Sequence, residues 1–134
     1  MITVEVDIEA PIGMVWECWT LPEHITKWNF ASDEWCCPSA TNELKSGGEF
    51  VWRMEAKDGS MGFDFKGVYD LIDHGKSISY KMDNGRKVVI NFSTKDHKTR
   101  VIESFETEGT NTDEQQRAGW QAILENLKKY VESK

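Results

Sequence analysis

A single long amphipathic helix in the last quarter of the chain most strongly constrains the fold. Thr112 and Gln115 have the spacing of a capping box, which predicts a helix from about Thr112 to Glu132. Lys128 and Lys129 suit the negative end of the helix dipole. The side chains that share one face of this helix are Gln116, Trp120, Ile123, Leu124, Leu127 and Val131. A helix with one apolar face needs a partner that covers that face, and the preceding residues must supply it.

Regular turn signals divide the middle of the chain, from about residue 34 to residue 108. Asp58-Gly59 and Asn84-Gly85 are the strongest, because type I′ turns need positive φ at both central residues. Similar signals are Ser46-Gly47-Gly48, His74-Gly75 and Asp96-His97. The intervals between these turns predict six successive antiparallel strands.

The first 30 residues predict one strand followed by two short helices. Apolar and polar residues alternate from Ile2 to Ile8, as in a half-buried strand. Pro11 suits a first helical turn, and Thr20 with Glu23 has the spacing of a second capping box. Gly67 lies inside a predicted strand, where we expect a bulge that tightens the sheet.

Alternation also assigns one apolar face to the predicted sheet. The side chains on that face include Phe50, Trp52, Met54, Phe63, Phe65, Ile78, Tyr80, Met82, Val88, Ile90, Phe92, Val101 and Phe105. The opposite faces carry mainly polar residues, as in a sheet that is covered on one side only. The expected fold is α+β: one domain over residues 1–134, with a curved seven-stranded antiparallel sheet around the long C-terminal helix and two short helices after the first strand.

Composition restricts the partners and the compartment. The formal net charge is −7, which disfavours general binding to polyanions such as nucleic acids or anionic membranes. No apolar run approaches the ~20 residues of a membrane span, and the N-terminal residues lack the pattern of a signal peptide. We therefore expect a cytoplasmic protein with no nucleic-acid or membrane partner.

Cysteine and histidine positions predict neither a metal site nor a disulfide framework. Cys18 is isolated, and Cys36 and Cys37 are adjacent, so there is no second pair to complete four zinc ligands. The cysteines are read as structural, with a reactive thiol at Cys36 or Cys37 as the alternative. The three histidines, which we expect to be solvated, are His24, His74 and His97. No nucleotide-binding or nucleophile motif occurs, and we expect no cofactor, no metal and no assigned catalytic residue.

Several local motifs carry a resemblance to a known family. They are Ala10-Pro11, Val15-Trp16, Trp19-Thr20, Pro22-Glu23-His24-Ile25-Thr26-Lys27-Trp28, Gly47-Gly48 with Phe50 and Met54, Asp58-Gly59, and Gln116-Arg117 with Gly119-Trp120 and Leu124. Their order resembles the helix-grip fold of the START/Bet v 1-like (SRPBCC) superfamily. The chain is similar to bacterial single-domain proteins related to the C-terminal domain of the activator of the heat-shock protein 90 ATPase. The resemblance implies a cavity between helix and sheet, which relatives use for apolar ligands or, in some branches, for cyclase chemistry.

Glu103 is the most informative candidate residue. Strand alternation places it inward with Val101 and Phe105, and a buried carboxylate must be paired, hydrated or protonated. Tyr80, on the same face, is a candidate hydrogen-bond partner. Three roles stay open for Glu103: holding local structure near the mouth of a cavity, orienting a ligand, or acting as a general acid or base.

We expect a modest cavity that contains water or a small apolar ligand, because a large empty one would cost too much stability. The predicted ligand-binding residues are Phe50, Trp52, Met54, Phe63, Phe65, Tyr80, Met82, Phe92, Glu103, Phe105, Gln116, Trp120, Ile123 and Leu124.

The sequence therefore favours a binding module for a small hydrophobic or aromatic molecule, as a monomer or weak dimer. Two alternatives stay open: a chaperone-linked interaction protein, and a cyclase or hydrolase that uses Glu103 and Tyr80.

Overall fold

The computed structural model describes all 134 residues and contains seven strands and three helices. In chain order they are β1 (Ile2–Ile8), α1 (Ile12–Thr20), α2 (Pro22–Trp28), β2 (Trp35–Asn42), β3 (Glu49–Ala56), β4 (Gly62–Asp73), β5 (Ser77–Met82), β6 (Lys87–Lys95), β7 (Lys98–Phe105) and α3 (Asp113–Glu132). This order confirms the predicted succession of one strand, two short helices, six strands and one long helix.

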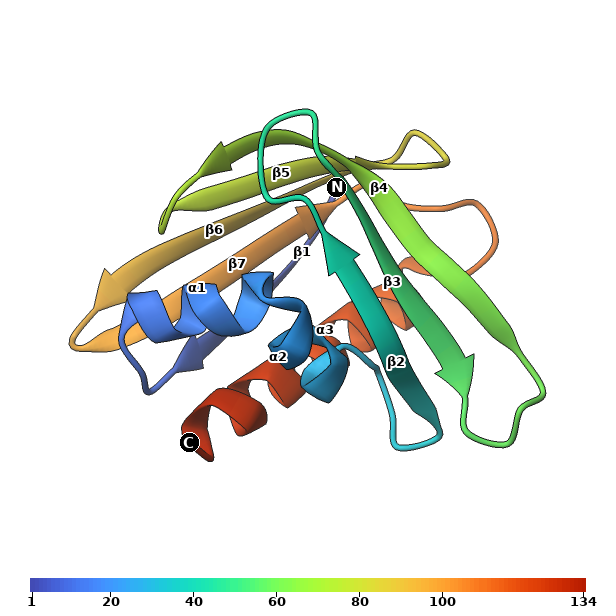
Figure 1. The fold of residues 1–134 in the computed structure, drawn as a ribbon, viewed down its shortest axis with the longest axis horizontal. Helices are drawn as coiled ribbons and strands as arrows, with labels where there is room; N and C mark the ends of the chain where they lie inside the picture. The colour runs from blue at the N-terminus through green and yellow to red at the C-terminus, as the bar shows by residue number, and fades with distance from the viewer.

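All seven strands form one antiparallel sheet in the order β1-β7-β6-β5-β4-β3-β2. The sheet curls over the three helices, which all lie on its concave side (Figure 1). β1 forms one edge of the sheet and pairs with β7, so that Ile2 lies opposite Phe105. The predicted α+β helix-grip architecture is thus confirmed.

Positive-φ residues occur at the predicted turns. Gly59 and Gly85 have φ values of 79° and 88°, in the left-handed region that glycine adopts without steric cost. The β6–β7 turn has positive φ at both Asp96 and His97, as the type I′ conformation requires. These turns set the strand register that points every second side chain toward the helices.

α3 begins as its sequence predicts. The Thr112 hydroxyl accepts a hydrogen bond from the Gln115 backbone N–H at 3.1 Å, and the Gln115 side chain accepts one from the Thr112 N–H at 3.0 Å. Gln116, Leu124 and Leu127 are buried on the face that meets the sheet. The capping box therefore fixes the end of the helix that lies beside the cavity described below.

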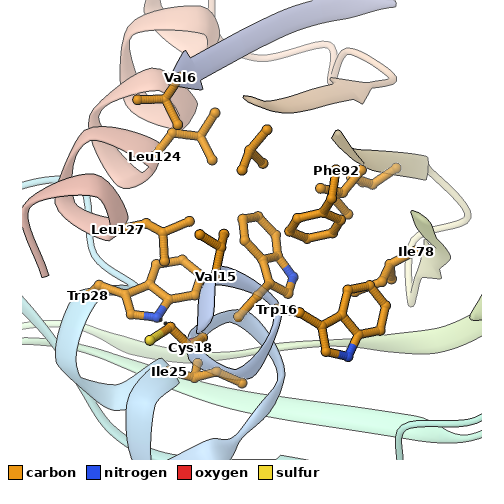
Figure 2. Close-up of a cluster of buried hydrophobic side chains, with 14 of the residues drawn as sticks. Val6, Val15, Trp16, Cys18, Ile25, Trp28, Ile78, Phe92, Leu124 and Leu127 are labelled. Carbon is orange, nitrogen blue, oxygen red and sulfur yellow. Dashed lines mark hydrogen bonds between the residues drawn. The ribbon is translucent and has the colours of Figure 1, made fainter. Parts of the chain in front are cut away.

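A dense apolar core fills the part of the concave space that lies above α1 and α2 (Figure 2). The ring of Trp16 meets Phe92 edge-on with centroids 5.2 Å apart, and the ring of Trp19 meets the same phenyl group at 5.7 Å. The Trp28 indole N–H donates to the carbonyl of Cys18 at 2.8 Å. These large side chains fill part of the space under the sheet.

Two sequence predictions about local structure are wrong. Thr20 does not cap α2: its hydroxyl donates to the Trp16 carbonyl within α1, and the residue at the cap is Leu21. Gly67 is not a bulge, because it lies in register opposite Phe50 and Met82; the irregularity falls between Tyr69 and Leu71. A Cβ at Gly67 would lie 2.4 Å from the Lys81 carbonyl oxygen, so a close approach between strands explains the glycine.

The prediction for His24 also needs correction. His74 and His97 are exposed, as expected. His24 is half-buried instead, and its Nδ1 lies 2.6 Å from the Tyr130 hydroxyl. Separately, none of the three helices has the length and apolar character that crossing a membrane requires.

Candidate functional site

A cavity of about 440 Å³ lies between the N-terminal half of α3 and the concave face of the sheet. This volume falls within the ~300–1,000 Å³ range of small-molecule pockets. Strands β3, β4, β5 and β7, the β5–β6 turn, the ends of α1 and α2, and α3 all contribute to its lining. It occupies the part of the concave space that the packed side chains of α1 and α2 leave unfilled.

Aromatic rings form much of the cavity wall. The rings of Trp52 and Phe65 are stacked with centroids 5.7 Å apart, because these residues lie opposite each other on β3 and β4. Phe65 also meets Trp120 of α3 edge-on at 6.3 Å. Trp120 is held from behind by Phe105, whose ring stacks on the indole at 4.0 Å. The wall therefore presents flat apolar surfaces to any molecule in the cavity.

Glu103 places a carboxyl group in this apolar setting. Its side chain is 4% exposed and lines the cavity. No hydrogen bond or ion pair joins the carboxyl group to another residue, and its oxygens remain accessible from the cavity. Burial alone raises the pKa of Glu103 to about 8. Glu103 is therefore mostly neutral at pH 7 and becomes half ionised near pH 8.

Two further polar groups accompany Glu103. Burial, followed by the charge of Glu103, raises the pKa of the Tyr80 phenol well above its ordinary value, so it stays protonated. The indole N–H of Trp52 is buried and has no hydrogen-bond partner in the protein. The predicted hydrogen bond between Tyr80 and Glu103 is not formed; the charge of Glu103 only contributes to the raised pKa of Tyr80.

Charged and polar residues surround the cavity mouth. Those among its lining residues are Asp64, Lys66, Asp83, Asn84, Arg86 and Glu108. Arg86 comes from the β5–β6 turn and donates from Nη1 to the Glu106 carbonyl at 3.4 Å, while its buried Nε–H has no partner. A more open hollow of about 390 Å³ adjoins the mouth and shares Arg86, Glu108 and Trp120 with it.

The structure brings most of the predicted ligand-binding residues together at the cavity. Those that line it are Trp52, Met54, Phe63, Phe65, Tyr80, Met82, Glu103, Trp120 and Ile123. Phe63 is 49% exposed and lies at the outer end, against the ring of Trp35. These residues converge on one space, and their role in binding a ligand stays a prediction.

The other predicted residues lie behind or beside the wall. Phe50 and Leu124 are fully buried in the core, Phe92 packs on Trp16 and Trp19, and Phe105 supports Trp120. Gln116 lines the neighbouring hollow, where its side chain accepts from the Glu108 N–H at 3.0 Å and donates to the Asn111 carbonyl at 3.0 Å.

Sequence reasoning missed the charged mouth. Arg86, Asp83 and Asn84 belong to a turn, and turn residues follow no alternation that would assign them to a face. The available signal was topological: the β5–β6 turn and the loop before α3 lie at the same end of the molecule (Figure 1). Trp19 of α1 and Trp28 of α2, which are absent from the predicted ligand-binding residues, also reach the lining.

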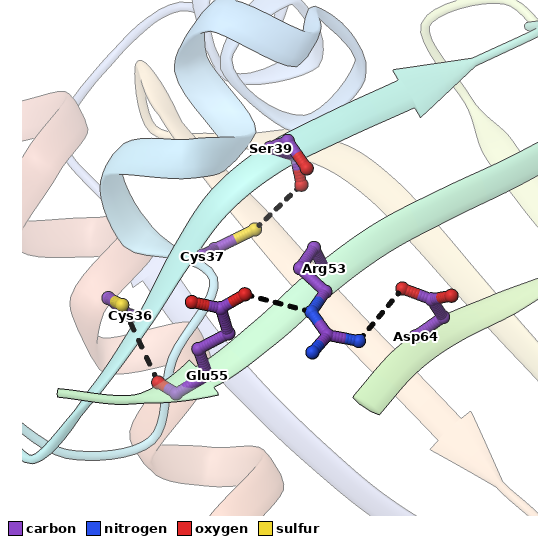
Figure 3. A network of polar contacts seen from close by, with 6 residues as sticks. All are labelled: Cys36, Cys37, Ser39, Arg53, Glu55 and Asp64. Carbon is purple, nitrogen blue, oxygen red and sulfur yellow. Dashed lines mark hydrogen bonds and ion pairs between the residues drawn. The ribbon is translucent and has the colours of Figure 1, made fainter. Parts of the chain in front are cut away.

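None of the three cysteines lines the cavity. Cys36 donates to the Glu55 carbonyl and Cys37 to the Ser39 carbonyl, beside an exposed ion-pair network in which Arg53 joins Glu55 and Asp64 (Figure 3). Burial raises the pKa of the Cys37 thiol, which disfavours the reactive thiolate form. The structural reading of the cysteines agrees with these contacts.

A curved antiparallel sheet that grips a C-terminal helix over a cavity defines a helix-grip protein of the Bet v 1-like superfamily. Residues 9–132 match the family described as "Activator of Hsp90 ATPase homolog 1-like protein", and the chain belongs to that family. A search of the curated proteins gives no significant match.

Solved structures agree with the family and the fold. The AHSA1-like protein from Aeromonas hydrophila is 40% identical, with a TM-score of 0.90 over 98% of this chain and 93% of that one. Chr148 from Cytophaga hutchinsonii is 51% identical, with a TM-score of 0.86 over 98% of this chain and 92% of that one. NE0264 from Nitrosomonas europaea, at 20% identity and a TM-score of 0.84 over 98% and 94% of the two chains, shares the fold.

Proposed function

We propose that this protein is a cytoplasmic binding module that holds a small hydrophobic or aromatic molecule between α3 and the sheet. The observation that carries the proposal is the 440 Å³ cavity, eleven of whose twenty lining residues are hydrophobic. The three free cysteines fit a reducing compartment. We expect the protein to act as a monomer or weak dimer.

The cost of an empty cavity supports this proposal. At ~24 cal/mol per Å³, a dry void of that size would cost about 10 kcal/mol, comparable with the ~5–15 kcal/mol stability of a whole domain. Solvent or a ligand must therefore fill the space. Water gains little against the rings of Trp52, Phe65 and Trp120, whereas a ligand with an apolar body buries them further.

A titration with the neutral fluorescent probe N-phenyl-1-naphthylamine tests the proposal. Wild-type protein should bind the probe saturably at one site, and Trp120→Phe should change the affinity because it reshapes the wall. Val68→Ala, on the exposed outer face of β4, is the matched control and should leave the affinity unchanged. Denaturant unfolding of each variant separates lost binding from lost folding. Absence of saturable binding by folded wild-type protein would overturn the proposal.

The family match favours a chaperone-linked function as a second candidate. The family description names an activator of the Hsp90 ATPase, which makes stimulation of that ATPase the direct assay. Purified chain should raise the ATPase rate of heat-shock protein 90 in proportion to complex formation if this function holds. No effect at concentrations far above that of the chaperone would reject it.

The environment of Glu103 favours an enzymatic alternative. A carboxyl group with a pKa of about 8 beside a protonated Tyr80 has the properties of a general acid or base. Native mass spectrometry of protein purified from its own host would identify any retained small molecule. Conversion of that molecule by wild type and not by Glu103→Gln would support an enzyme, whereas unchanged release would support a binding module.

A further inference from the structure

The cavity contains one group that a purely apolar binding site would not require. Glu103 lies between Val4 of β1 and Ile90 of β6 in the sheet register, where an apolar side chain would suit the neighbours. Burying a carboxyl group without a partner costs several kcal/mol. Glu103 therefore lowers the stability of the fold when it has no partner, which indicates that a ligand supplies the partner.

We propose that the cavity selects molecules whose aromatic or apolar body carries a positively charged nitrogen, and that Glu103 binds this nitrogen. This inference rests on the proposed binding function and specifies its ligand class. An ammonium group supplies hydrogen-bond donors and a positive charge, neither of which the protein offers to the Glu103 carboxylate.

The ionisable groups around Glu103 leave the carboxylate free for a ligand cation. Tyr80 of β5 and Tyr69 of β4, farther along the sheet, are phenols whose pKa values are raised, so they carry no charge. The residues opposite on β1 and β6, Val4 and Ile90, and the nearest α3 lining residues, Trp120 and Ile123, are not ionisable. Arg86 at the mouth donates to the Glu106 carbonyl, and none of the ion pairs of the protein joins it to Glu103.

The net charge of the protein favours a cation over an anion. At the mouth the lining charges balance, because Asp64 pairs with Arg53, while Asp83 and Glu108 are matched by Lys66 and Arg86. The chain as a whole carries a net charge of −7. A negative protein attracts approaching cations and slows anions.

The aromatic wall fits the same class of molecule. A cation within ~6 Å of an indole or phenyl centroid is attracted to the ring face, most strongly for tryptophan. Trp52, Phe65 and Trp120 line the cavity together with Glu103. A planar ligand body can stack on these rings while its ammonium group reaches the carboxylate.

Binding of such a cation is coupled to proton release. Free Glu103, with a pKa of about 8, is mostly protonated at pH 7. The ammonium ligand binds the carboxylate, so the Glu103 proton leaves to solvent as the ion pair forms. The affinity should therefore rise with pH, by up to about 50-fold between pH 6 and pH 8, and level off above that range.

Three indoles that differ only in their side-chain end provide the test by isothermal titration calorimetry. Tryptamine carries an ammonium group, 3-ethylindole is neutral, and indole-3-propionate carries a carboxylate. At pH 8, tryptamine should bind wild-type protein at least tenfold more tightly than either of the others. Titrations in buffers of different ionisation enthalpy at pH 7 should show release of close to one proton.

Two variants assign the effect to Glu103. Glu103→Gln should remove the preference for tryptamine, its rise in affinity with pH and the released proton. Glu17→Gln, which removes an exposed carboxylate of α1 outside the cavity lining, is the matched control and should keep all three, with affinity within about threefold. Thermal unfolding by circular dichroism verifies that each variant is folded.

The outcomes distinguish this inference from the proposed function. If 3-ethylindole or indole-3-propionate binds as tightly as tryptamine, cation selection is overturned while the cavity remains a binding site. If N-phenyl-1-naphthylamine binds and none of the indoles does, cation selection is overturned and the proposed binding function stands. Failure of all four molecules to bind folded protein overturns both proposals. A preference for tryptamine that persists in Glu103→Gln removes Glu103 as its source and overturns the inference.

Discussion

The indole of Trp120 stacks on the phenyl ring of Phe105, with centroids 4.0 Å apart and an interplanar angle of 12°. This contact joins α3 to β7 at the cavity, so one face of the indole belongs to the core and the other side meets the cavity. Trp120 is accordingly only partly buried. Its contribution to stability and its contribution to cavity shape are therefore separable by substitution.

Trp120→Ala should lower the free energy of unfolding by about 3 kcal/mol, the lower end of the range for buried tryptophan because the side chain is partly exposed. Trp120→Phe should lose less, since a phenyl ring can still stack on Phe105. Urea unfolding measures both. Arg117→Ala, on the exposed face of the same helix, should change stability by no more than about 0.5 kcal/mol. Equal stability of Trp120→Ala and wild type would show that the stack contributes nothing.

Glu103 should make stability fall as pH rises. Its pKa of about 8 in the folded protein exceeds the ordinary value of 4.5, so the folded state binds more protons than the unfolded state between these two values. The penalty is absent below about pH 4.5, grows as pH rises, and is complete above about pH 8.

Glu103→Gln should therefore gain stability over wild type by up to about 1.4 kcal/mol per pH unit, or about 4 kcal/mol in all, between pH 5 and pH 8. Urea unfolding across this range gives the difference, in which the contributions of other ionisable groups cancel. Glu17→Gln, on the exposed face of α1, should show no such trend. A difference between Glu103→Gln and wild type that does not vary with pH would contradict an elevated pKa.

Gly67 and Gly13 should respond to alanine in opposite directions. A Cβ at Gly67 would lie 2.4 Å from the Lys81 carbonyl oxygen and 3.0 Å from the Phe50 ring, so Gly67→Ala should destabilise the protein by about 1–3 kcal/mol. Gly13 lies within α1 with no atom within 4 Å of its Cβ position, so Gly13→Ala should stabilise it by about 0.5–1 kcal/mol. Thermal unfolding measures both signs; the same sign for both variants would refute the steric explanation.

Thr112→Ala should cost about 1 kcal/mol, because the N–H of Gln115 loses its side-chain acceptor at the start of α3. Thr112→Ser retains a hydroxyl at the same place and should stay within a few tenths of a kcal/mol of wild type. Urea unfolding compares the three proteins. A loss as large in the serine variant would assign the effect to the threonine methyl group and not to the cap.

The sequence predicted the elements whose signals are local and periodic. Thr112 with Gln115 identified the start of α3, and pairs such as Asn84-Gly85 identified the turns. The cap predicted at Thr20 was wrong because its hydroxyl donates to the Trp16 carbonyl inside α1, and residue spacing does not distinguish between these two hydrogen bonds. The bulge predicted at Gly67 was wrong because this position needs glycine for another reason, the close approach of the Lys81 carbonyl oxygen. That contact is known only once the strands are paired.

The sequence also predicted which residues face the candidate site, but not which of them line the cavity. Alternation gave inward residues such as Trp52, Tyr80 and Glu103, since each strand has only two faces. It did not separate residues beside the cavity from residues behind its wall, because Phe92 and Phe105 lie on the same concave face of the sheet as the lining residues. That distinction depends on which part of the concave space Trp16 and Trp19 fill, which is a property of the packed structure.

The pairing of β1 with β7 has a consequence for how the chain is made. Ile2 lies opposite Phe105, so the strand of the sheet that leaves the ribosome first has as its neighbour the strand that leaves last. Until β7 emerges, the apolar side of β1 has no sheet to join, and the α3 face that also covers it is still unmade. The hairpins from β2 to β6 can form as they appear, but closure of the sheet waits for β7. A nascent chain stopped before β7 should therefore remain protease-sensitive, and native protection should arise in one late step.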